Sequence, residues 1–194
     1  VEKMKIKPLK GMDVKGKKIL FRPDINSPID PVTKKIVNEN RIRKMAPTLR
    51  YLLDGGAAVA VIAHQGDTLD YQNLIPMNEH AEKLSQATGY EVRYIDDVCG
   101  DAAVACVKAL KPGECILLGN LRYLTEEVST FEKDVKLTPE QMKDTYLIRR
   151  LAPLFDLYVN DAFSAAHRNC PSMTGFQRVL PSVAGFQFFD EYFA

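Results

Sequence analysis

Short apolar runs alternate along this chain with longer amphipathic stretches, and this alternation restricts the fold more than any other feature. The runs at 57–63 (A-A-V-A-V-I-A) and 115–118 (C-I-L-L) are almost continuously hydrophobic, as is typical of strands that helices cover on both faces. We therefore predict five buried strands, at 18–21, 57–63, 91–95, 115–118 and 155–159.

The amphipathic stretches between these runs predict helices. Apolar residues recur at helical spacing over 42–53, and Gly55-Gly56 stops that helix. Pro47 interrupts the pattern, so we expect a kink or a late start there. Asn78 is a suitable N-cap for the next helix, which Gly89 closes.

Two further helices complete the alternation. One begins at Asp101 and is ended by Pro112-Gly113, and the capping box T-P-E-Q at 138–141 opens another that runs towards Pro153. The predicted fold class is α/β: an open parallel sheet with right-handed crossovers and helices on both faces, a Rossmann-like three-layer sandwich in a single domain. Longer loops are expected at 23–40, 65–77, 124–137 and 169–185.

The charges of the chain nearly cancel, with 26 Lys and Arg against 25 Asp and Glu. This balance argues against a nucleic-acid-binding protein, which needs an excess of basic residues for its phosphate contacts, but it permits a local basic pocket. No apolar run approaches the ~20 residues of a membrane span, so we expect no membrane contact and a cytoplasmic location.

The four cysteines, at 99, 106, 115 and 170, form no C-x-x-C pair and have no histidine at zinc-like spacing. We therefore expect no metal site. Cys106 and Cys115 lie in apolar stretches, which indicates buried, reduced thiols and a reducing compartment.

Polar groups follow four of the predicted strands, at the edge of a parallel sheet where ligands bind. They are Arg22, Asp24 and Asn26 after the first strand, His64, Gly66 and Asp67 after the second, Asn120 and Arg122 after 115–118, and Asp161, His167 and Arg168 after the last. A single Arg at such a place is more often part of a surface ion pair. Four such strand ends together indicate a pocket for a small anion, because guanidinium groups match phosphate and carboxylate oxygens.

Other functional signatures are absent from the sequence. It contains no G-x-x-x-x-G-K-[ST] loop, no G-x-G-x-x-G after a strand and no G-x-S-x-G elbow. We interpret His80 as a solvated residue of a polar helix. We interpret Asp96-Asp97 and Glu126-Glu127 as exposed charges rather than acid-base pairs.

Five segments, in order and spacing, resemble the phosphoglycerate kinase family. They are K-K-I-L-F-R-P-D-I-N-S-P, N-E-N-R-I-R-K-M-A-P-T-L-R-Y-L-L-D-G-G-A, A-H-Q-G-D, K-P-G-E-C-I-L-L-G-N-L-R-Y and V-N-D-A-F-S-A-A-H-R, and V-L-P-S-V-A-G at 179–185 agrees with them. The H-Q-G sequence and the T-x-x-x-R-R-L-A-P-L-F-D segment resemble the archaeal branch of the family.

The resemblance implies a two-domain glycolytic enzyme that transfers a phosphoryl group between 1,3-bisphosphoglycerate and ADP, giving 3-phosphoglycerate and ATP. We expect residues 1–185 to form the domain that binds the phosphoglycerate and 186–194 to begin the interdomain helix. The C-terminal domain, which binds Mg-ATP or Mg-ADP in the family, would be absent from this chain and would be its intramolecular partner. The chain alone is expected to bind substrate without turnover, because the transfer needs both substrates in line.

The resemblance also implies roles for individual residues. Arg41 matches the family's catalytic arginine and would neutralise charge on the transferred phosphoryl group. The substrate's carboxylate and hydroxyl end would be bound by Asp24, Ile25 and Asn26. Its distal phosphate would be held by His64, Arg122 and Arg168. The loop that shapes this end of the site contains Gln65, Gly66 and Asp67, and the supporting residues are Asn120 and His167.

Three residues depart from the family pattern at this edge of the sheet. Asp67 stands where the family has an arginine, Gly119 where it usually has Glu, and Pro23 where it has an aliphatic residue. The loss of one phosphate-binding arginine costs about 1.5–3 kcal/mol. These departures leave open an alternative, a non-catalytic kinase-like module that binds another anion, which the affinity of Asp67→Arg for phosphoglycerate would distinguish. A third reading, an unrelated dinucleotide-binding α/β protein, lacks the glycine fingerprint.

Overall fold

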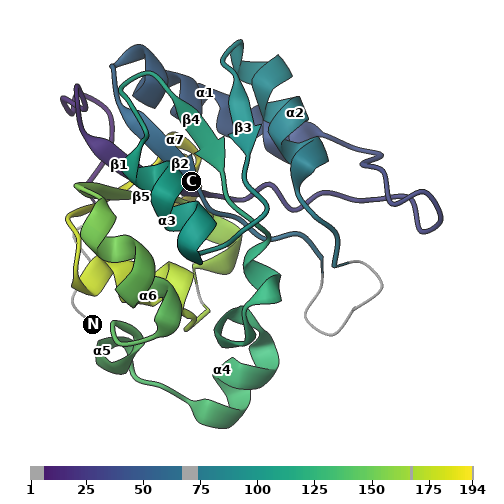
Figure 1. The fold of residues 1–194 in the computed structure, drawn as a ribbon, viewed down its shortest axis with the longest axis vertical. Helices are drawn as coiled ribbons and strands as arrows, with labels where there is room; N and C mark the ends of the chain where they lie inside the picture. Colours follow the sequence, from purple (N-terminus) through teal and green to yellow (C-terminus); the bar gives the residue numbers. More distant parts are fainter. Residues whose placement is uncertain (1–6, 67–73, 167, 194) are drawn as a thin grey trace.

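A computed structural model describes residues 7–66, 74–166 and 168–193. Within these residues all strand pairings are parallel, and the sheet has the order β3-β4-β2-β1-β5-β6 (Figure 1). The strands are β1 (Lys18–Pro23), β2 (Ala58–Val61), β3 (Val92–Tyr94), β4 (Cys115–Leu117), β5 (Leu157–Asp161) and β6 (Ser182–Ala184). The predicted α/β class with an open parallel sheet is confirmed.

β1 lies in the middle of the sheet, with Leu20 opposite Ala60 of β2 on one side and Tyr158 of β5 on the other. The chain first builds the β2-β4-β3 side and then returns to add β5 and β6 beyond β1. Successive connections therefore diverge at the carboxyl end of β1. In open α/β sheets, ligands bind at such a reversal.

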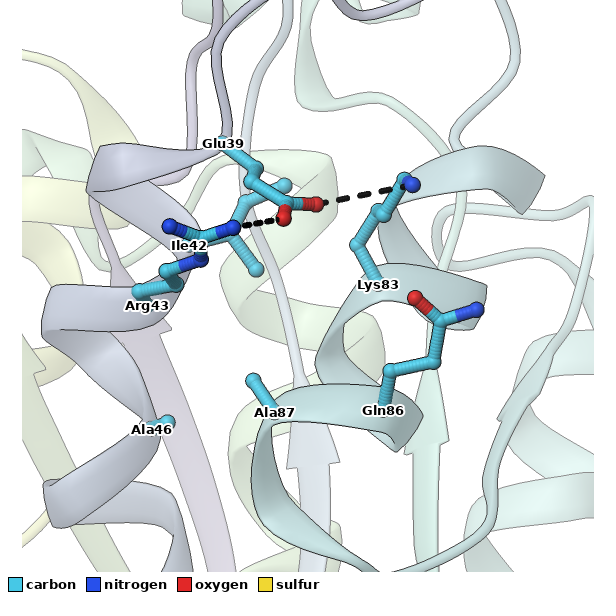
Figure 2. A pocket seen from close by; sticks show the side chains of 7 residues that line it. All are labelled: Glu39, Ile42, Arg43, Ala46, Lys83, Gln86 and Ala87. Carbon is cyan, nitrogen blue, oxygen red and sulfur yellow. Dashed lines mark hydrogen bonds and ion pairs between the residues drawn. The ribbon is translucent and has the colours of Figure 1, made fainter.

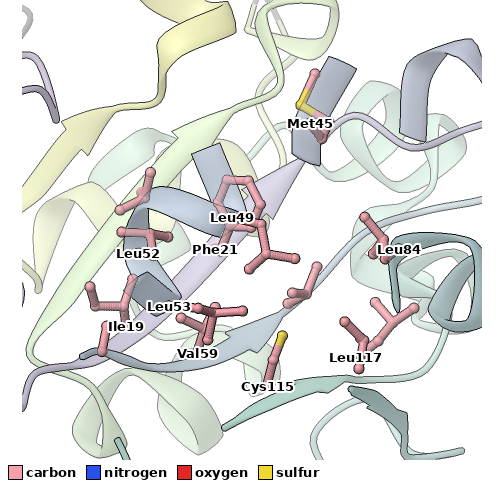
Figure 3. Packing of buried hydrophobic residues seen from close by; sticks show 14 of the residues in the cluster. Ile19, Phe21, Met45, Leu49, Leu52, Leu53, Val59, Leu84, Cys115 and Leu117 are labelled. Carbon is pink, nitrogen blue, oxygen red and sulfur yellow. The ribbon is translucent and has the colours of Figure 1, made fainter. Parts of the chain in front are cut away.

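Alternate residues of each strand face opposite layers. Ile19 and Phe21 pack against α1 (Asn40–Asp54) and α2 (Asn78–Thr88), a core that Figure 3 shows, and Phe186 of α7 (Phe186–Phe193) packs against the same cluster. Leu20 faces the other layer, with α3 (Asp101–Lys108) and α6 (Tyr146–Leu151). Each fully buried Leu or Ile contributes about 1.5–3 kcal/mol, so two apolar layers hold the sheet edge in place.

Helix α1 begins at Asn40 and contains Pro47, so of the two alternatives predicted there, a kink or a late start, the late start is wrong. Pro47 cannot donate a backbone hydrogen bond inside the helix, but the buried apolar face of α1 on both sides of it offsets this loss. At the start of α1, Glu39 forms ion pairs with Arg43 and with Lys83 of α2 (Figure 2).

Two predicted helix boundaries are also wrong. Asn78 is the first residue of α2 rather than its cap, and α3 ends at Lys108, well before Pro112. The end of α2 at Gly89 is confirmed, because Gly89 has a φ of 77°, a backbone conformation that favours glycine.

The capping box at Thr138 forms, but its helix is short. α5 (Pro139–Met142) ends where the Thr145 hydroxyl donates to the Met142 carbonyl at 2.7 Å. The carboxylate of Glu126 then accepts the backbone N–H of Tyr146 at 2.8 Å and starts α6. The single helix predicted from 138 towards Pro153 is therefore divided, with a 3-10 turn at Ala152–Leu154 after α6.

Two of the predicted loops contain secondary structure. The segment 124–137 includes α4 (Ser129–Val135), and 169–185 includes a π-helical turn at Pro171–Gly175 and the strand β6. β5 is displaced by two residues from its predicted bounds and includes Asn160 and Asp161. A helix long and apolar enough to cross a membrane is not found among the described residues.

Candidate functional site

His64 follows β2 and is buried. Arginines from four other segments of the chain lower the pKa of its imidazole. Burial first, and then the charges of Arg22, Arg122, Arg168 and Arg41, hold the pKa of His64 well below its usual range. Its imidazole is therefore neutral at physiological pH. Arg22 donates to His64, and the charges of the other three arginines also lower its pKa. We call these four arginines and His64 the basic group.

Arg22 is the most deeply buried member of this group, with 2% of its surface exposed. Its guanidinium donates to the Pro23 carbonyl at 2.7 Å, to the Ser172 hydroxyl at 3.4 Å and to Nδ1 of His64 at 3.0 Å. A guanidinium has no acceptor atom, so Nδ1 accepts and the proton of neutral His64 lies on Nε2. The sequence analysis placed Arg22 just after the first strand, among the polar groups of the predicted pocket, and gave it no specific role, whereas the structure places it inside β1.

Residues 24–26 directly follow β1 and lie beside Arg41 of the basic group. Arg41 Nη1 lies 3.6 Å from the Asp24 carboxylate and donates to the Asn26 carbonyl at 3.2 Å. Ile25 is fully buried and anchors the segment by packing. The Asn26 side-chain oxygen accepts the Gly66 N–H at 3.1 Å, so residues 24–26 are connected to the segment that follows β2.

Asn120, after β4, holds the residue that follows His64. Its amide oxygen accepts the N–H groups of Gln65 and Arg122 at 3.1 and 3.0 Å, and its amide nitrogen donates to the Gln65 carbonyl at 2.9 Å. Asn120 is completely buried. Asn120 therefore connects the residues after β2 with those after β4, and its role as a supporting residue of the site stays a prediction.

His80 contradicts our interpretation, because it is completely buried in α2 rather than solvated. Its Nε2 lies 2.7 Å from the side-chain oxygen of Gln65. The periodicity of a helix identifies a polar face but does not indicate which partner covers it, so this long-range contact left no signal in the sequence.

Arg122 and Arg168 come from two later segments of the chain, which follow β4 and β5. Arg122 is 8% exposed, and burial, followed by repulsion from Arg168 and Arg22, lowers its pKa. Arg168 donates through Nε and Nη2 to Glu132 at 3.2 Å and through Nη2 to the Glu127 carbonyl at 3.1 Å. The Nε and Nη2 side of the Arg168 guanidinium is therefore already bonded to the carboxylate of Glu132.

Two acidic residues do not lie where the sequence predicted them. Asp161 accepts hydrogen bonds at 2.7 Å from the Thr48 hydroxyl and from the Phe188 N–H, so it ties β5 to α1 and α7 instead of facing the basic group. Glu127, predicted to be exposed, is buried and accepts the Ser172 N–H at 3.0 Å.

The three departures from the family pattern have different outcomes. Pro23 is the last residue of β1, opposite Asp161 of β5 and two residues beyond the end of the pairing with β2 at Phe21 and Val61, so the backbone donor that proline lacks falls at the end of the strand. Gly119 is packed against residue 97, and a Cβ there would come within 3.2 Å of the Asp97 backbone. Asp67 and His167, both predicted site residues, lie outside the described residues.

Two hollows elsewhere lack the features of an anion site. One of about 330 Å³ lies between α1 and α2 (Figure 2), but its charges already form the pairs of Glu39. Another, of about 760 Å³, is lined mainly by apolar groups and contains one basic side chain, Lys10. The described residues include no group of three or more His, Cys, Asp or Glu that could hold a metal ion, and all four cysteines are free thiols.

Comparison with known proteins identifies the family. The family model for phosphoglycerate kinase matches residues 9–194. The phosphoglycerate kinase of Sulfurisphaera tokodaii is 42% identical over 95% of this chain, and that of Methanothermobacter thermautotrophicus is 42% identical over 93%. The matched region makes up 43% and 42% of these archaeal proteins, so the chain spans less than half of their length.

Solved structures agree with the sequence matches. The phosphoglycerate kinase of Pyrococcus horikoshii gives a TM-score of 0.87 at 36% identity, over 96% of this chain and 44% of that structure. The enzyme of Coxiella burnetii gives 0.75 at 26% identity, over 96% of this chain and 43% of that structure. Family model, sequence relatives and fold all agree, and the chain belongs to the phosphoglycerate kinase family.

Proposed function

We propose that this chain is the phosphoglycerate-binding part of a phosphoglycerate kinase. The whole protein would transfer a phosphoryl group reversibly between 1,3-bisphosphoglycerate and ADP, giving 3-phosphoglycerate and ATP in glycolysis, a role that favours a cytoplasmic location. The observation that carries the proposal is the basic surroundings of His64 at the reversal of the sheet: Arg22 donates to its Nδ1 at 3.0 Å, and the charges of Arg122, Arg168 and Arg41 also lower its pKa.

The distal phosphate would bind to Arg122, Arg168 and the Nε2–H of neutral His64. Burial, and then repulsion from Arg168 and Arg22, lowers the pKa of Arg122, and a phosphate between Arg122 and Arg168 would relieve their repulsion. Gln65 and Gly66 would shape this end of the site through their bonds to Asn120 and Asn26.

The other end of the substrate would lie beside residues 24–26. Asp24 would accept a hydrogen bond from the substrate hydroxyl, and Asn26 with the backbone of Ile25 would bind near its carboxylate. Arg41 has a half-exposed side chain beside Asp24. It would neutralise the charge of the phosphoryl group during transfer, the kind of electrostatic stabilisation on which this chemistry depends.

We propose that residues 1–185 form the substrate domain and that 186–194 begin the helix that leads to a nucleotide-binding domain. α7 begins at this boundary, and Asp161 accepts the backbone N–H of Phe188 in its first turn. The described residues contain no acidic cluster that could hold a metal ion. We therefore assign Mg-ATP or Mg-ADP to the part of the relatives that the matched region does not cover.

Calorimetric titration of 3-phosphoglycerate into the chain tests this proposal. Arg122→Ala and Arg168→Ala should each weaken binding by about 10- to 100-fold, because each removes charged hydrogen bonds to the ligand. Arg93→Ala is the matched control, since Arg93 is an exposed arginine on β3. Affinity that is the same in all three variants and in the unmodified chain would refute the assignment.

A further inference from the structure

His80 lies outside the basic group and has no role in the proposed chemistry, yet its side chain is completely buried. Its Nε2 lies 2.7 Å from the side-chain oxygen of Gln65. That oxygen only accepts, so Nε2 carries the hydrogen. Burial lowers the pKa of His80 to about 4, which leaves the ring neutral and Nδ1 unprotonated at physiological pH.

The other ring nitrogen, Nδ1, has no hydrogen-bond partner among the described residues. A buried polar atom without a partner is unfavourable. Leucine would fill a similar volume without introducing this atom. The contact of Nε2 with Gln65 is therefore the feature that accounts for a histidine at this position.

The side-chain amide of Gln65 forms two hydrogen bonds with the backbone of Ser27, a residue beside the proposed substrate site. Its oxygen also accepts the N–H of Ser27 at 2.9 Å, and its nitrogen donates to the Ser27 carbonyl at 2.9 Å. Ser27 directly follows the segment 24–26. The Gly66 N–H holds the Asn26 side chain at 3.1 Å, so the end of this segment is fixed from two sides.

We propose that His80 is a positioning residue of the phosphoglycerate site. Its Nε2–H fixes the amide of Gln65, and Gln65 fixes Ser27 and thereby the backbone of residues 24–26. This inference rests on the proposed function, because it assumes that Asp24 and Asn26 contact the ligand. Without the donor at position 80, the Gln65 amide gains freedom to rotate, and the backbone of residues 24–26 is less ordered before the ligand binds.

Two substitutions of similar polarity separate this role from simple packing. In His80→Gln the amide nitrogen takes the place of Nε2, whereas in His80→Asn it takes the place of Nδ1 and does not reach Gln65. We expect His80→Asn to weaken binding of 3-phosphoglycerate about 10-fold and to speed amide hydrogen exchange at Ser27, as for a lost buried hydrogen bond. His80→Gln should restore both, and exchange at Leu52, in the core face of α1, should change in neither variant.

The outcomes distinguish this inference from the proposed function. Equal affinity and equal Ser27 exchange in His80→Asn and the unmodified chain would overturn the inference alone. No binding of 3-phosphoglycerate to the unmodified chain would overturn the proposed function, and Ser27 exchange would still report whether His80 orders the segment. If His80→Asn does not fold, the 15N shifts of the unmodified ring decide: a proton on Nδ1 instead of Nε2 would refute the contact.

Discussion

The burial of His80 makes the fold sensitive to acid between pH 6.5 and about 4. Burial lowers the pKa of this histidine from 6.5 to about 4, whereas the unfolded chain keeps the ordinary value. As the pH falls through this interval, the unfolded state takes up a proton and the folded state does not. The free energy of unfolding therefore falls by up to about 1.4 kcal/mol for each pH unit. Well above pH 6.5 the ring is neutral in both states and contributes no pH dependence.

His80→Gln removes this titration while keeping the donor to Gln65. Urea unfolding followed by circular dichroism, suited to a chain with no Trp, should be measured from about pH 7 to about pH 4.5. Over that range the unmodified chain should lose about 2.5 kcal/mol more stability than the variant. The buried His64 titrates in both proteins and cancels in the difference. Parallel pH dependences of the two proteins would refute the reasoning.

Three further predictions follow from the same structure. Asp161→Ala should lower the free energy of unfolding by about 2–4 kcal/mol, because two buried donors lose their acceptor, and Asp161→Asn should lose less; equal melting temperatures would contradict this. Glu132→Gln should tighten binding of 3-phosphoglycerate about 3-fold by releasing the fork of Arg168, and unchanged or weaker binding by calorimetry would count against it. Cys106, predicted to be buried, is only partly buried, so a thiol reagent should modify it first, because the other three thiols are buried with a raised pKa; equal rates of modification would contradict this.

The sheet and much of the residue group at its edge were predictable because both depend on local patterns. A continuous apolar run identifies a strand that is covered on both faces, and the carboxyl end of that strand fixes where the next residue lies. His64 and Arg122 follow their strands within a few residues. The correct sheet topology was therefore enough to predict that His64 and Arg122 lie near each other.

The features that sequence reasoning missed depend on contacts between distant residues. β5 continues through Asn160 and Asp161 because their polar side chains find partners, in one case the Ala162 N–H and in the other α1 and α7. Glu127 is buried by a contact with Ser172, 45 residues away, and His80 by one with Gln65, 15 residues away. A hydrophobicity pattern contains no record of such pairs.

The hydrogen bonds of Arg22 have a consequence for handling the protein. They go to a carbonyl, a hydroxyl and a neutral imidazole, so a buried cation lies near the carboxyl end of β1 without a counter-ion among these partners. A dianion above His64 would supply the missing compensation, and ligand concentration would then raise the melting temperature. Storage in phosphate or sulfate would accordingly stabilise the chain while competing with the proposed ligand, 3-phosphoglycerate, and the choice of buffer would bias every affinity measured on it.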